Sequence, residues 1–248
     1  MSSAALRIAG LCKVFGGLKA VNDVSLTIAG GERRVLIGPN GAGKTTLFHC
    51  ITGTLQPSAG SITMFGHDVT RLDEPARTRQ GMGRTFQITN VFKQLTVLEN
   101  LALATLGKDR RKWAMWRSVR RYDDVRSAGL QALGMVGLAD RANDPADRLS
   151  YGERRQLELA LALQTAPRVL FLDEPCAGLS PNERQRISRM IAGLPRDITL
   201  LMIEHDMDVA LALADSVTVL HRGNVIAEGS PAEVQADAEV REVYFGHV

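Results

Sequence analysis

The sequence predicts an α/β fold in which a mainly parallel sheet is joined by an antiparallel β layer and by an inserted lobe of helices. Three observations lead to this prediction. A glycine-rich loop at residues 38–46 lies between an apolar run and a segment that can open a helix. Apolar runs at 169–172 and 198–203 flank a helix-like segment, which is typical of parallel strands covered on both faces. Residues from about 88 to 150 favour helices instead.

Composition allows one domain, residues 1–248, with the helical subdomain inside it. The chain has 248 residues, 45% of them hydrophobic, so it can bury a full core without disulfides or metal. Its three cysteines are far apart and lack metal-binding spacing, which argues against a disulfide framework or a zinc site. With no signal peptide and no apolar stretch of about 18 residues, we expect a chain that is neither exported nor membrane-spanning.

Short antiparallel strands are expected ahead of the glycine-rich loop. β-prone runs between residues 6 and 37 alternate with turn signals at 16–17, 22–23 and 30–31. After the loop, residues 46–51 continue a helix and residues 61–65 form another strand of the same layer. Residues 216–227, with Arg-Gly-Asn in the middle, predict a β-hairpin.

The loop matches the pattern GxxxxGK[ST] completely, which indicates that it binds a nucleoside triphosphate. Its glycines let backbone N–H groups turn around phosphate oxygens, and the following helix N-terminus adds a partial positive charge. Lys44 would reach the β- and γ-phosphates, and the Thr45 hydroxyl would bind Mg²⁺. A turn that only caps a helix is the alternative, but the flanking strand and helix patterns weigh against it. The candidate nucleotide-binding residues here are Gly38, Pro39, Asn40, Gly41, Ala42, Gly43, Lys44, Thr45 and Thr46.

Two carboxylates, Asp173 and Glu174, directly follow the first of the two apolar runs. They should emerge at the same sheet edge as the glycine-rich loop, because ligands gather at the carboxyl ends of parallel strands. Asp173 would hold Mg²⁺ through water or Thr45, and Glu174 would polarise or orient the water that attacks the γ-phosphorus. Helix capping by the two acids is the alternative, since Asp and Glu also favour first turns.

Residues 149–153 read Leu-Ser-Tyr-Gly-Glu and precede a helix-like run. Ser150 and Glu153 form a capping box, which by itself accounts for both side chains, although a capped helix start is also an anion site. The segment resembles the signature motif of ATP-binding cassette (ABC) proteins, commonly Leu-Ser-Gly-Gly-Gln, and an acidic strand follows it in both. The resemblance implies that Ser150, Tyr151, Gly152 and Glu153 contact the nucleotide of a partner cassette.

The other ABC landmarks occur in the same order, and the resemblance covers essentially the whole chain. It implies that Gln87 senses Mg²⁺ and the attacking water, that His205 contacts the γ-phosphate, and that Phe15 stacks on adenine. Taken singly, these would be a solvated glutamine, a structural histidine and a core phenylalanine. Residues 177–180 match the loop that crosses to the partner cassette, with Ser180 in place of the usual Asp.

Residues 84–101, 150–153 and 227–234 closely resemble the ATPase subunits of bacterial branched-chain (hydrophobic) amino-acid importers. That resemblance implies ATP and Mg²⁺ as cofactors, with a sister cassette or a second copy as dimer partner. It also implies two membrane permeases, a periplasmic solute-binding protein acting indirectly, and a peripheral position on the cytoplasmic face of the inner membrane. The solute cannot be named from this chain, because in such systems its pocket lies in other subunits.

Several alternatives remain open at this point. A soluble ABC ATPase acting on nucleic acid or ribosomes usually carries long coiled coils or two fused cassettes, and this sequence has neither. The cassette of a lipid or lipopolysaccharide exporter would share the same core. The basic residues 108–121, which include Trp113 and Trp116, suit a membrane surface or nucleic acid, or an ordinary solvated helix face. The net charge of +3 does not demand a nucleic-acid partner, and none is expected.

Overall fold

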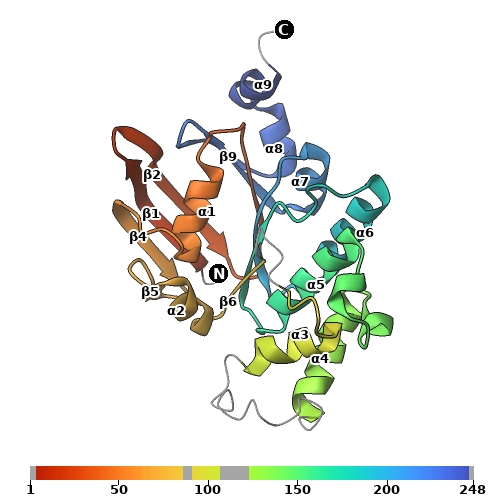
Figure 1. The fold of residues 1–248 in the computed structure, drawn as a ribbon. Helices are drawn as coiled ribbons and strands as arrows, with labels where there is room; N and C mark the ends of the chain where they lie inside the picture. The colour runs from red at the N-terminus through yellow and green to blue at the C-terminus, as the bar shows by residue number, and fades with distance from the viewer. Residues whose placement is uncertain (1–3, 86–90, 107–122, 246–248) are drawn as a thin grey trace. The chain divides into compact units, whose positions relative to one another are not determined.

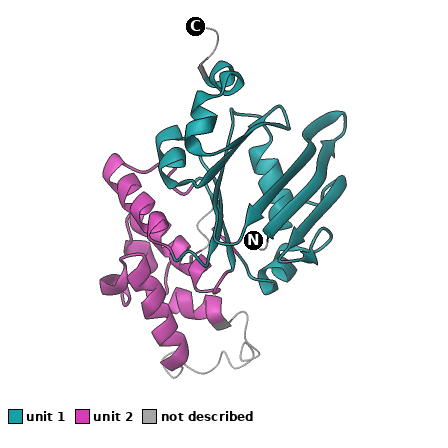
Figure 2. Cartoon of the chain, turned by 180° about the vertical axis from the view of Figure 1, so that it is seen from behind, with its two compact units in different colours: residues 1–82, 168–174, 195–248 teal, residues 83–167, 175–194 magenta. Residues whose placement is uncertain are grey.

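A computed structural model describes residues 4–85, 91–106 and 123–245 of the chain. The chain divides into two compact units, which Figure 2 colours separately. The first comprises residues 1–82, 168–174 and 195–248, and the second comprises residues 83–167 and 175–194. Within the described residues, every helix falls short of the length and apolar character needed to cross a bilayer.

The first unit contains an antiparallel sheet, as predicted, with the strand order β2-β1-β4-β5. One expected turn was wrong, because residues 22–23 lie inside a long strand. The pairing of β1 with β2 shifts register between Leu11↔Val24 and Lys13↔Val21, and Asp23 has a φ of 53°. Residues 22–23 therefore form a β-bulge in β2. Asn and Asp tolerate the left-handed conformation in bulges as they do in turns. The strands are β1 (Ala4–Phe15), β2 (Leu18–Ala29), β4 (Ala59–Met64) and β5 (His67–Asp68).

The mainly parallel sheet is also confirmed, with the order β10-β9-β3-β8-β7-β6. Strand β3 pairs in parallel with both β8 and β9, and β7 pairs in parallel with β8. Every residue of β3, β7 and β8 is buried, which explains their continuous apolar runs. Strands β9 and β10 form the predicted hairpin. The bounds are β3 (Arg33–Ile37), β6 (Met82–Arg84), β7 (Val169–Asp173), β8 (Thr199–Ile203), β9 (Ser216–His221) and β10 (Asn224–Gly229).

Helix α1 (Lys44–Thr52) lies between the two sheets of the first unit (Figure 1). Its Leu47, Phe48 and Ile51 are fully buried in a core shared with both sheets. The Phe48 ring meets the ring of Phe171 on β7 edge to face, with centroids 5.7 Å apart. This packing fixes α1 against β7, the strand that ends at Asp173 and is followed directly by Glu174. The other helices of this unit are α2 (Glu74–Arg79), α7 (Met207–Leu213), α8 (Pro231–Ala236) and α9 (Ala238–Phe245).

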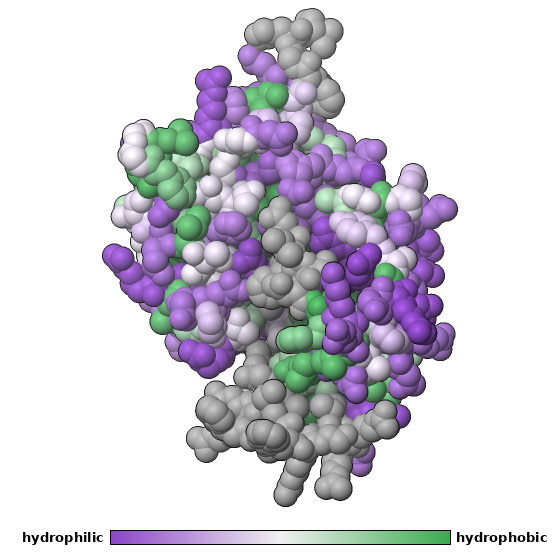
Figure 3. Space-filling view, viewed as in Figure 1, coloured by the Kyte–Doolittle hydropathy of each residue, from purple (hydrophilic) through white to green (hydrophobic). Residues whose placement is uncertain are grey.

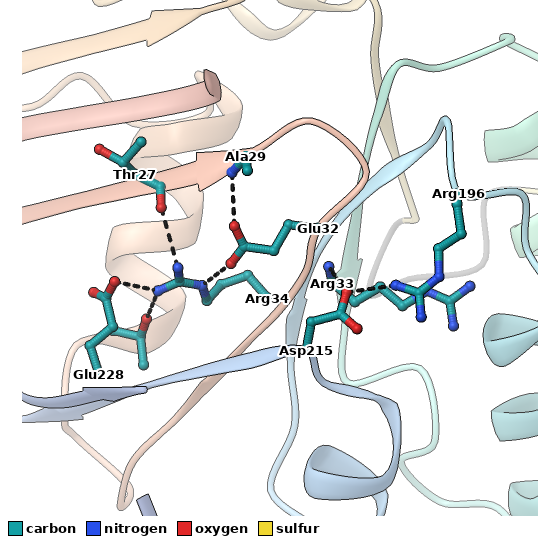
Figure 4. A network of polar contacts seen from close by, with 9 residues as sticks. Thr27, Ala29, Glu32, Arg33, Arg34, Arg196, Asp215 and Glu228 are labelled. Carbon is teal, nitrogen blue, oxygen red and sulfur yellow. Dashed lines mark hydrogen bonds and ion pairs between the residues drawn. The ribbon is translucent and has the colours of Figure 1, made fainter. Parts of the chain in front are cut away.

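A buried arginine anchors the beginning of β3 (Figure 4). Arg34 is 5% exposed and forms ion pairs with Glu32 at 2.7 Å and with Glu228 on β10 at 2.8 Å. Its guanidinium also donates to the Thr218 hydroxyl on β9 and to a backbone carbonyl of β2. The network ties β3 to β2, β9 and β10, so the loop at the other end of β3 starts from a fixed strand.

A second buried arginine, Arg77 on α2, lies at the end of α1. It is 0% exposed, and burial lowers its pKa to about 10. Its Nη1 donates to the carbonyls of Cys50 (2.7 Å) and Ile51 (2.5 Å) in the last turn of α1. Its other nitrogens donate to two carbonyls in the segment between β5 and α2. A cation at a helix C-terminus satisfies unpaired carbonyls and complements the helix dipole.

The second unit is mainly helical in its described part. Helix α3 packs against α4 and α5. A Cβ built on Gly129 of α4 would lie 2.8 Å from Cδ1 of Leu98 on α3, so the glycine allows the two helices to approach closely. Gln164, just after α5, donates to the Thr105 hydroxyl on α3 at 2.7 Å. The basic residues 108–121 lie outside the described residues. The helices are α3 (Val97–Leu106), α4 (Asp123–Met135), α5 (Tyr151–Leu163) and α6 (Pro181–Ala192), with short 3₁₀ turns at Ala139–Arg141 and Ala146–Arg148.

Candidate nucleotide-binding site

The glycine-rich loop connects β3 to α1, as the sequence predicts. Gly38, Gly41 and Gly43 have φ values of 153°, 79° and 100°, in the region that favours glycine. A Cβ on Gly43 would collide with the Ala20 carbonyl oxygen, so the loop also passes too close to β2 for a side chain. Gly43 precedes the first helical residue, and no side chain caps it. The first turn of α1 therefore presents backbone N–H groups that suit phosphate oxygens.

Lys44 is the first residue of α1, directly after this loop, and is 5% exposed. Its Nζ donates to the carbonyls of Gly38 at 2.6 Å and Pro39 at 3.0 Å. The lysine side chain therefore reaches back from the end of the loop to its first two residues. Burial lowers the pKa of Lys44, and the Glu174 carboxylate opposes that shift. An ammonium group has three donors on a flexible stem, so Lys44 can exchange carbonyl partners for phosphate oxygens.

Glu174 and His205 form a close pair at the carboxyl ends of β7 and β8. Glu174 Oε1 lies 2.7 Å from His205 Nε2. The Glu174 backbone N–H donates to the Ile203 carbonyl, and its φ of 48° is unusual for a residue with a side chain. Such a conformation costs on the order of 1–3 kcal/mol and persists only where the surroundings enforce it. It turns the chain out of β7, so that the carboxylate meets the histidine.

An open hollow of about 750 Å³ in the first unit brings these groups together. Residues 40–46 of the loop line it, together with Glu174 and His205. Sequence reasoning missed two cationic residues that also line it, Lys19 on β2 and Arg222 in the β9–β10 turn. The turn itself was recognisable, but nothing local in the sequence placed it beside the loop. Three cationic residues in the lining, Lys19, Lys44 and Arg222, suit a polyanionic ligand.

Phe15 ends β1 and is 46% exposed. It pairs with Leu18 across the hairpin, and Leu18, which is 67% exposed, lines the hollow. Figure 3 shows hydrophobic residues in green at the end of this hairpin. Lys13 Nζ lies 4.9 Å from the centre of the Phe15 ring. An exposed aromatic ring beside the hollow offers a flat surface on which a purine base can stack.

The residues near the loop fit Mg²⁺ by their chemistry and position. Asp173, Ile203 and Leu36 lie in one row across β7, β8 and β3, so Asp173 faces the loop end of the sheet. Thr45 offers an exposed hydroxyl in the first turn of α1. The described residues contain no group of three or more His, Cys, Asp or Glu that could hold a metal by itself. Mg²⁺ usually takes one or two protein oxygens together with phosphate and water, and a threonine hydroxyl and an aspartate carboxylate are oxygen ligands of that kind.

The signature-like residues lie in the second unit, where Ser150 caps α5. The Ser150 hydroxyl accepts from the Glu153 N–H at 3.2 Å, and Glu153 Oε2 accepts from the Ser150 N–H at 2.8 Å, which confirms the capping box. Hydrogen bonding from the Ser150 backbone lowers the pKa of Glu153. Tyr151 is 44% exposed, and its hydroxyl donates to the Ala177 carbonyl at 3.4 Å. The signature segment therefore contacts the segment predicted to cross to a partner.

Gln87 lies outside the described residues. Ser180, which stands where the resembled family usually has Asp, is the residue that precedes α6, and its N–H and hydroxyl both donate to Glu183 Oε2, at 3.0 and 2.6 Å. In this chain Ser180 therefore caps the N-terminus of α6 together with Glu183.

The family profile described as "ABC transporter" matches residues 21–177, more than half of the chain. The chain belongs to this family of ATP-binding cassettes. A second profile, described as "Branched-chain amino acid ATP-binding cassette transporter", matches residues 224–248 of the cassette. Membership makes the cassette a nucleotide-binding ATPase.

Relatives match the cassette from end to end. It is 38% identical to the "High-affinity branched-chain amino acid transport ATP-binding protein LivG" of Salmonella typhimurium over 255 residues, 99% of each chain. It is also 38% identical over 256 residues to the corresponding protein BraF of Pseudomonas aeruginosa, again covering 99% of each chain. LivG of Escherichia coli is 37% identical over 255 residues, with the same coverage.

Solved structures confirm the fold class of the cassette. The ADP conformation of MJ1267, an ATP-binding cassette of an ABC transporter, matches with a TM-score of 0.88 and 31% identity, covering 99% of this chain and 100% of that one. MJ0796, a bacterial ABC transporter cassette solved as a dimer, matches with a TM-score of 0.77 and 25% identity, covering 91% and 98%.

Proposed function

We propose that this cassette is the ATP-hydrolysing subunit of a bacterial importer for branched-chain amino acids or a related small solute. The observation that carries the proposal is the likeness to LivG and BraF over 99% of both chains, because their names state branched-chain amino acid transport. The match of residues 224–248 to the branched-chain cassette profile supports the same assignment.

In this function the hollow of the first unit binds ATP. Phe15 stacks on adenine, the backbone N–H groups of residues 40–46 surround the phosphates, and Lys44 exchanges its carbonyl partners for β- and γ-phosphate oxygens. Thr45, Asp173 and Gln87 hold Mg²⁺, which when bound neutralises charge on the phosphates. Lys19 and Arg222 add positive charge at the rim.

Glu174 acts as the base in hydrolysis. Its carboxylate orients the attacking water and accepts its proton, while His205 turns from Glu174 toward the γ-phosphate. Gln87 positions the same water. The pair at 2.7 Å keeps both groups at the strand ends, within reach of the loop that carries the phosphates.

A second cassette completes the site, and it is either a sister chain or a second copy. Ser150 and Gly152 of one cassette donate hydrogen bonds to the γ-phosphate held by the other, and Tyr151 and Glu153 support that helix start. The dimeric structure of the similar cassette MJ0796 supports this arrangement. The pair works on two membrane permeases at the cytoplasmic face of the inner membrane, and a periplasmic solute-binding protein delivers the solute.

The proposal is tested by replacing the loop lysine. Lys44→Ala removes charge-assisted hydrogen bonds worth about 1.5–3 kcal/mol, so ATP affinity should fall tenfold or more. Affinity is measured by fluorescence titration with a labelled ATP analogue. In a strain that lacks its own cassette, labelled leucine uptake should be restored by the wild-type chain and not by Lys44→Ala.

Lys93→Ala is the matched control, because Lys93 is an exposed lysine of the second unit and does not line the hollow. It should bind ATP and support uptake like the wild type. Equal ATP affinity of Lys44→Ala and wild type would contradict the nucleotide site. Leucine uptake that is independent of the cassette would contradict the solute class while leaving the ATPase assignment intact.

A further inference from the structure

One carboxylate in the second unit connects the crossing loop with the start of the signature helix α5. Glu183 lies in the first turn of α6, and its Oε2 accepts from the Ser180 N–H and hydroxyl. Its Oε1 lies at the Gly152 backbone, and the Gly152 N–H donates a hydrogen bond to the carboxylate. A Cβ built on Gly152 would overlap Oε1, so only a glycine permits this approach.

The contact gives a second backbone N–H in the first turn of α5 a hydrogen-bond partner. A helix start leaves its first backbone N–H groups without partners inside the helix. In α5 the Glu153 N–H donates to the Ser150 hydroxyl, and the Gly152 N–H donates to the Glu183 carboxylate. Thus an anion of this chain occupies a helix N-terminus whose partial positive charge attracts anions.

The carboxylate is ionised at neutral pH. Hydrogen bonds from the Ser180 hydroxyl, from the Ser180 N–H and, with the smallest effect, from the Gly152 N–H lower the pKa of Glu183, and desolvation opposes them. The space left beside it, between the starts of α5 and α6, has a volume of about 40 Å³, which suits water molecules rather than a phosphate chain.

A second helix of the chain shows that capping does not require the Gly152 contact. Helix α8 begins Ser-Pro-Ala-Glu, as α6 begins Ser-Pro-Asn-Glu. Glu233 Oε2 accepts from the Ser230 N–H and hydroxyl, both at 2.7 Å. Among the described residues, the hydrogen bonds that lower the pKa of Glu233 come from Ser230 alone. The bond from Gly152 is therefore an addition specific to Glu183.

We propose that the Glu183 carboxylate competes with the γ-phosphate of the partner cassette for the Gly152 N–H, and so sets how much ATP is needed to close the dimer. The inference rests on the proposed function, in which that N–H donates to the nucleotide in trans. When the triphosphate arrives, like-charge repulsion moves the carboxylate away from α5. Glu183 keeps its two bonds to Ser180, so releasing Gly152 leaves the start of α6 capped.

The test measures dimer formation without turnover. In a Glu174→Gln background, which slows hydrolysis, we expect Glu183→Gln to lower the ATP concentration for half-maximal dimerisation about two- to fivefold, the range expected for one charge at a helix N-terminus. Dimer is quantified by size-exclusion chromatography with light scattering at a series of ATP concentrations. The difference should shrink at 1 M salt, because it is electrostatic.

Glu233→Gln in the same background is the matched control, since it changes the same capping arrangement on a helix outside the signature region. It should leave the half-maximal ATP concentration unchanged, and both variants should lose similar thermal stability. Equal behaviour of the two variants, or a higher ATP requirement for Glu183→Gln, overturns the inference alone. If Glu174→Gln shows no ATP-dependent dimer at all, the proposed function fails and the inference fails with it.

Discussion

Glu174→Gln is expected to lower the kcat of ATP hydrolysis about 10²- to 10⁴-fold, the range for removing a positioned general base. The amide keeps the size of the side chain and can still contact His205 Nε2, 2.7 Å away in the native pair, but it cannot accept the proton of water. ATP binding should persist, because Lys44 and the backbone of the loop are unchanged. The variant should therefore accumulate as an ATP-bound dimer, detected by size-exclusion chromatography and phosphate release.

Asp208→Asn provides the comparison for this variant. Asp208 is an exposed carboxylate in the first turn of α7, near His205 in sequence and outside the lining of the hollow. Its conversion to an amide should leave kcat within about twofold of wild type, as expected for surface substitutions. If Glu174→Gln turns over ATP as fast as Asp208→Asn does, Glu174 is not the base.

Arg77→Met should lower the free energy of unfolding by about 3–5 kcal/mol, because it removes the hydrogen-bond donor of several buried backbone carbonyls. Methionine fills the same space, but the carbonyls of Cys50 and Ile51 lose their donor, and each buried unsatisfied group costs about 1–3 kcal/mol. Because Arg77 is 0% exposed, solvent water cannot take the place of the guanidinium as donor to these carbonyls. Urea unfolding followed by circular dichroism measures the change.

Arg79→Met separates this effect from a general loss of arginine in α2. Arg79 belongs to the same short helix and is exposed, so its replacement should change stability by less than about 0.5 kcal/mol. Arg77→Lys should fall between the two, because one ammonium cannot reach carbonyls on both sides of the native guanidinium. Unfolding midpoints that coincide for Arg77→Met and Arg79→Met would contradict the role assigned to Arg77.

Local patterns predicted the parts of the fold that depend on local chemistry. The loop at 38–46, the buried strands β7 and β8, the hairpin β9–β10 and the Ser150–Glu153 capping box each carry a complete signal within about a dozen residues. The turn expected at residues 22–23 failed because Asn-Asp permits a left-handed residue without saying whether the chain reverses there. In the structure, β2 pairs with β1 on both sides of residues 22–23, so the left-handed residue forms a bulge inside the strand and the chain does not reverse.

Contacts between distant segments were not predictable in the same way. Arg77 and Arg34 look like ordinary charged residues in the sequence, and their burial depends on carbonyls and carboxylates brought by other elements. Lys19 and Arg222 line the hollow beside the glycine-rich loop because two hairpins, far apart in the sequence, both lie next to that loop. The bond from Gly152 to Glu183 likewise joins two helix starts, and a single sequence gives no sign of it.

The order of the strands has a consequence for how the chain is made on the ribosome. Strand β3 pairs with β8 and β9, which are translated roughly 160 residues later or more. At about 5–20 residues per second, β3 and the loop after it wait roughly 8–30 s for their neighbours. During that time an apolar segment is exposed to aggregation, so nascent chains of this protein should be early clients of ribosome-associated chaperones.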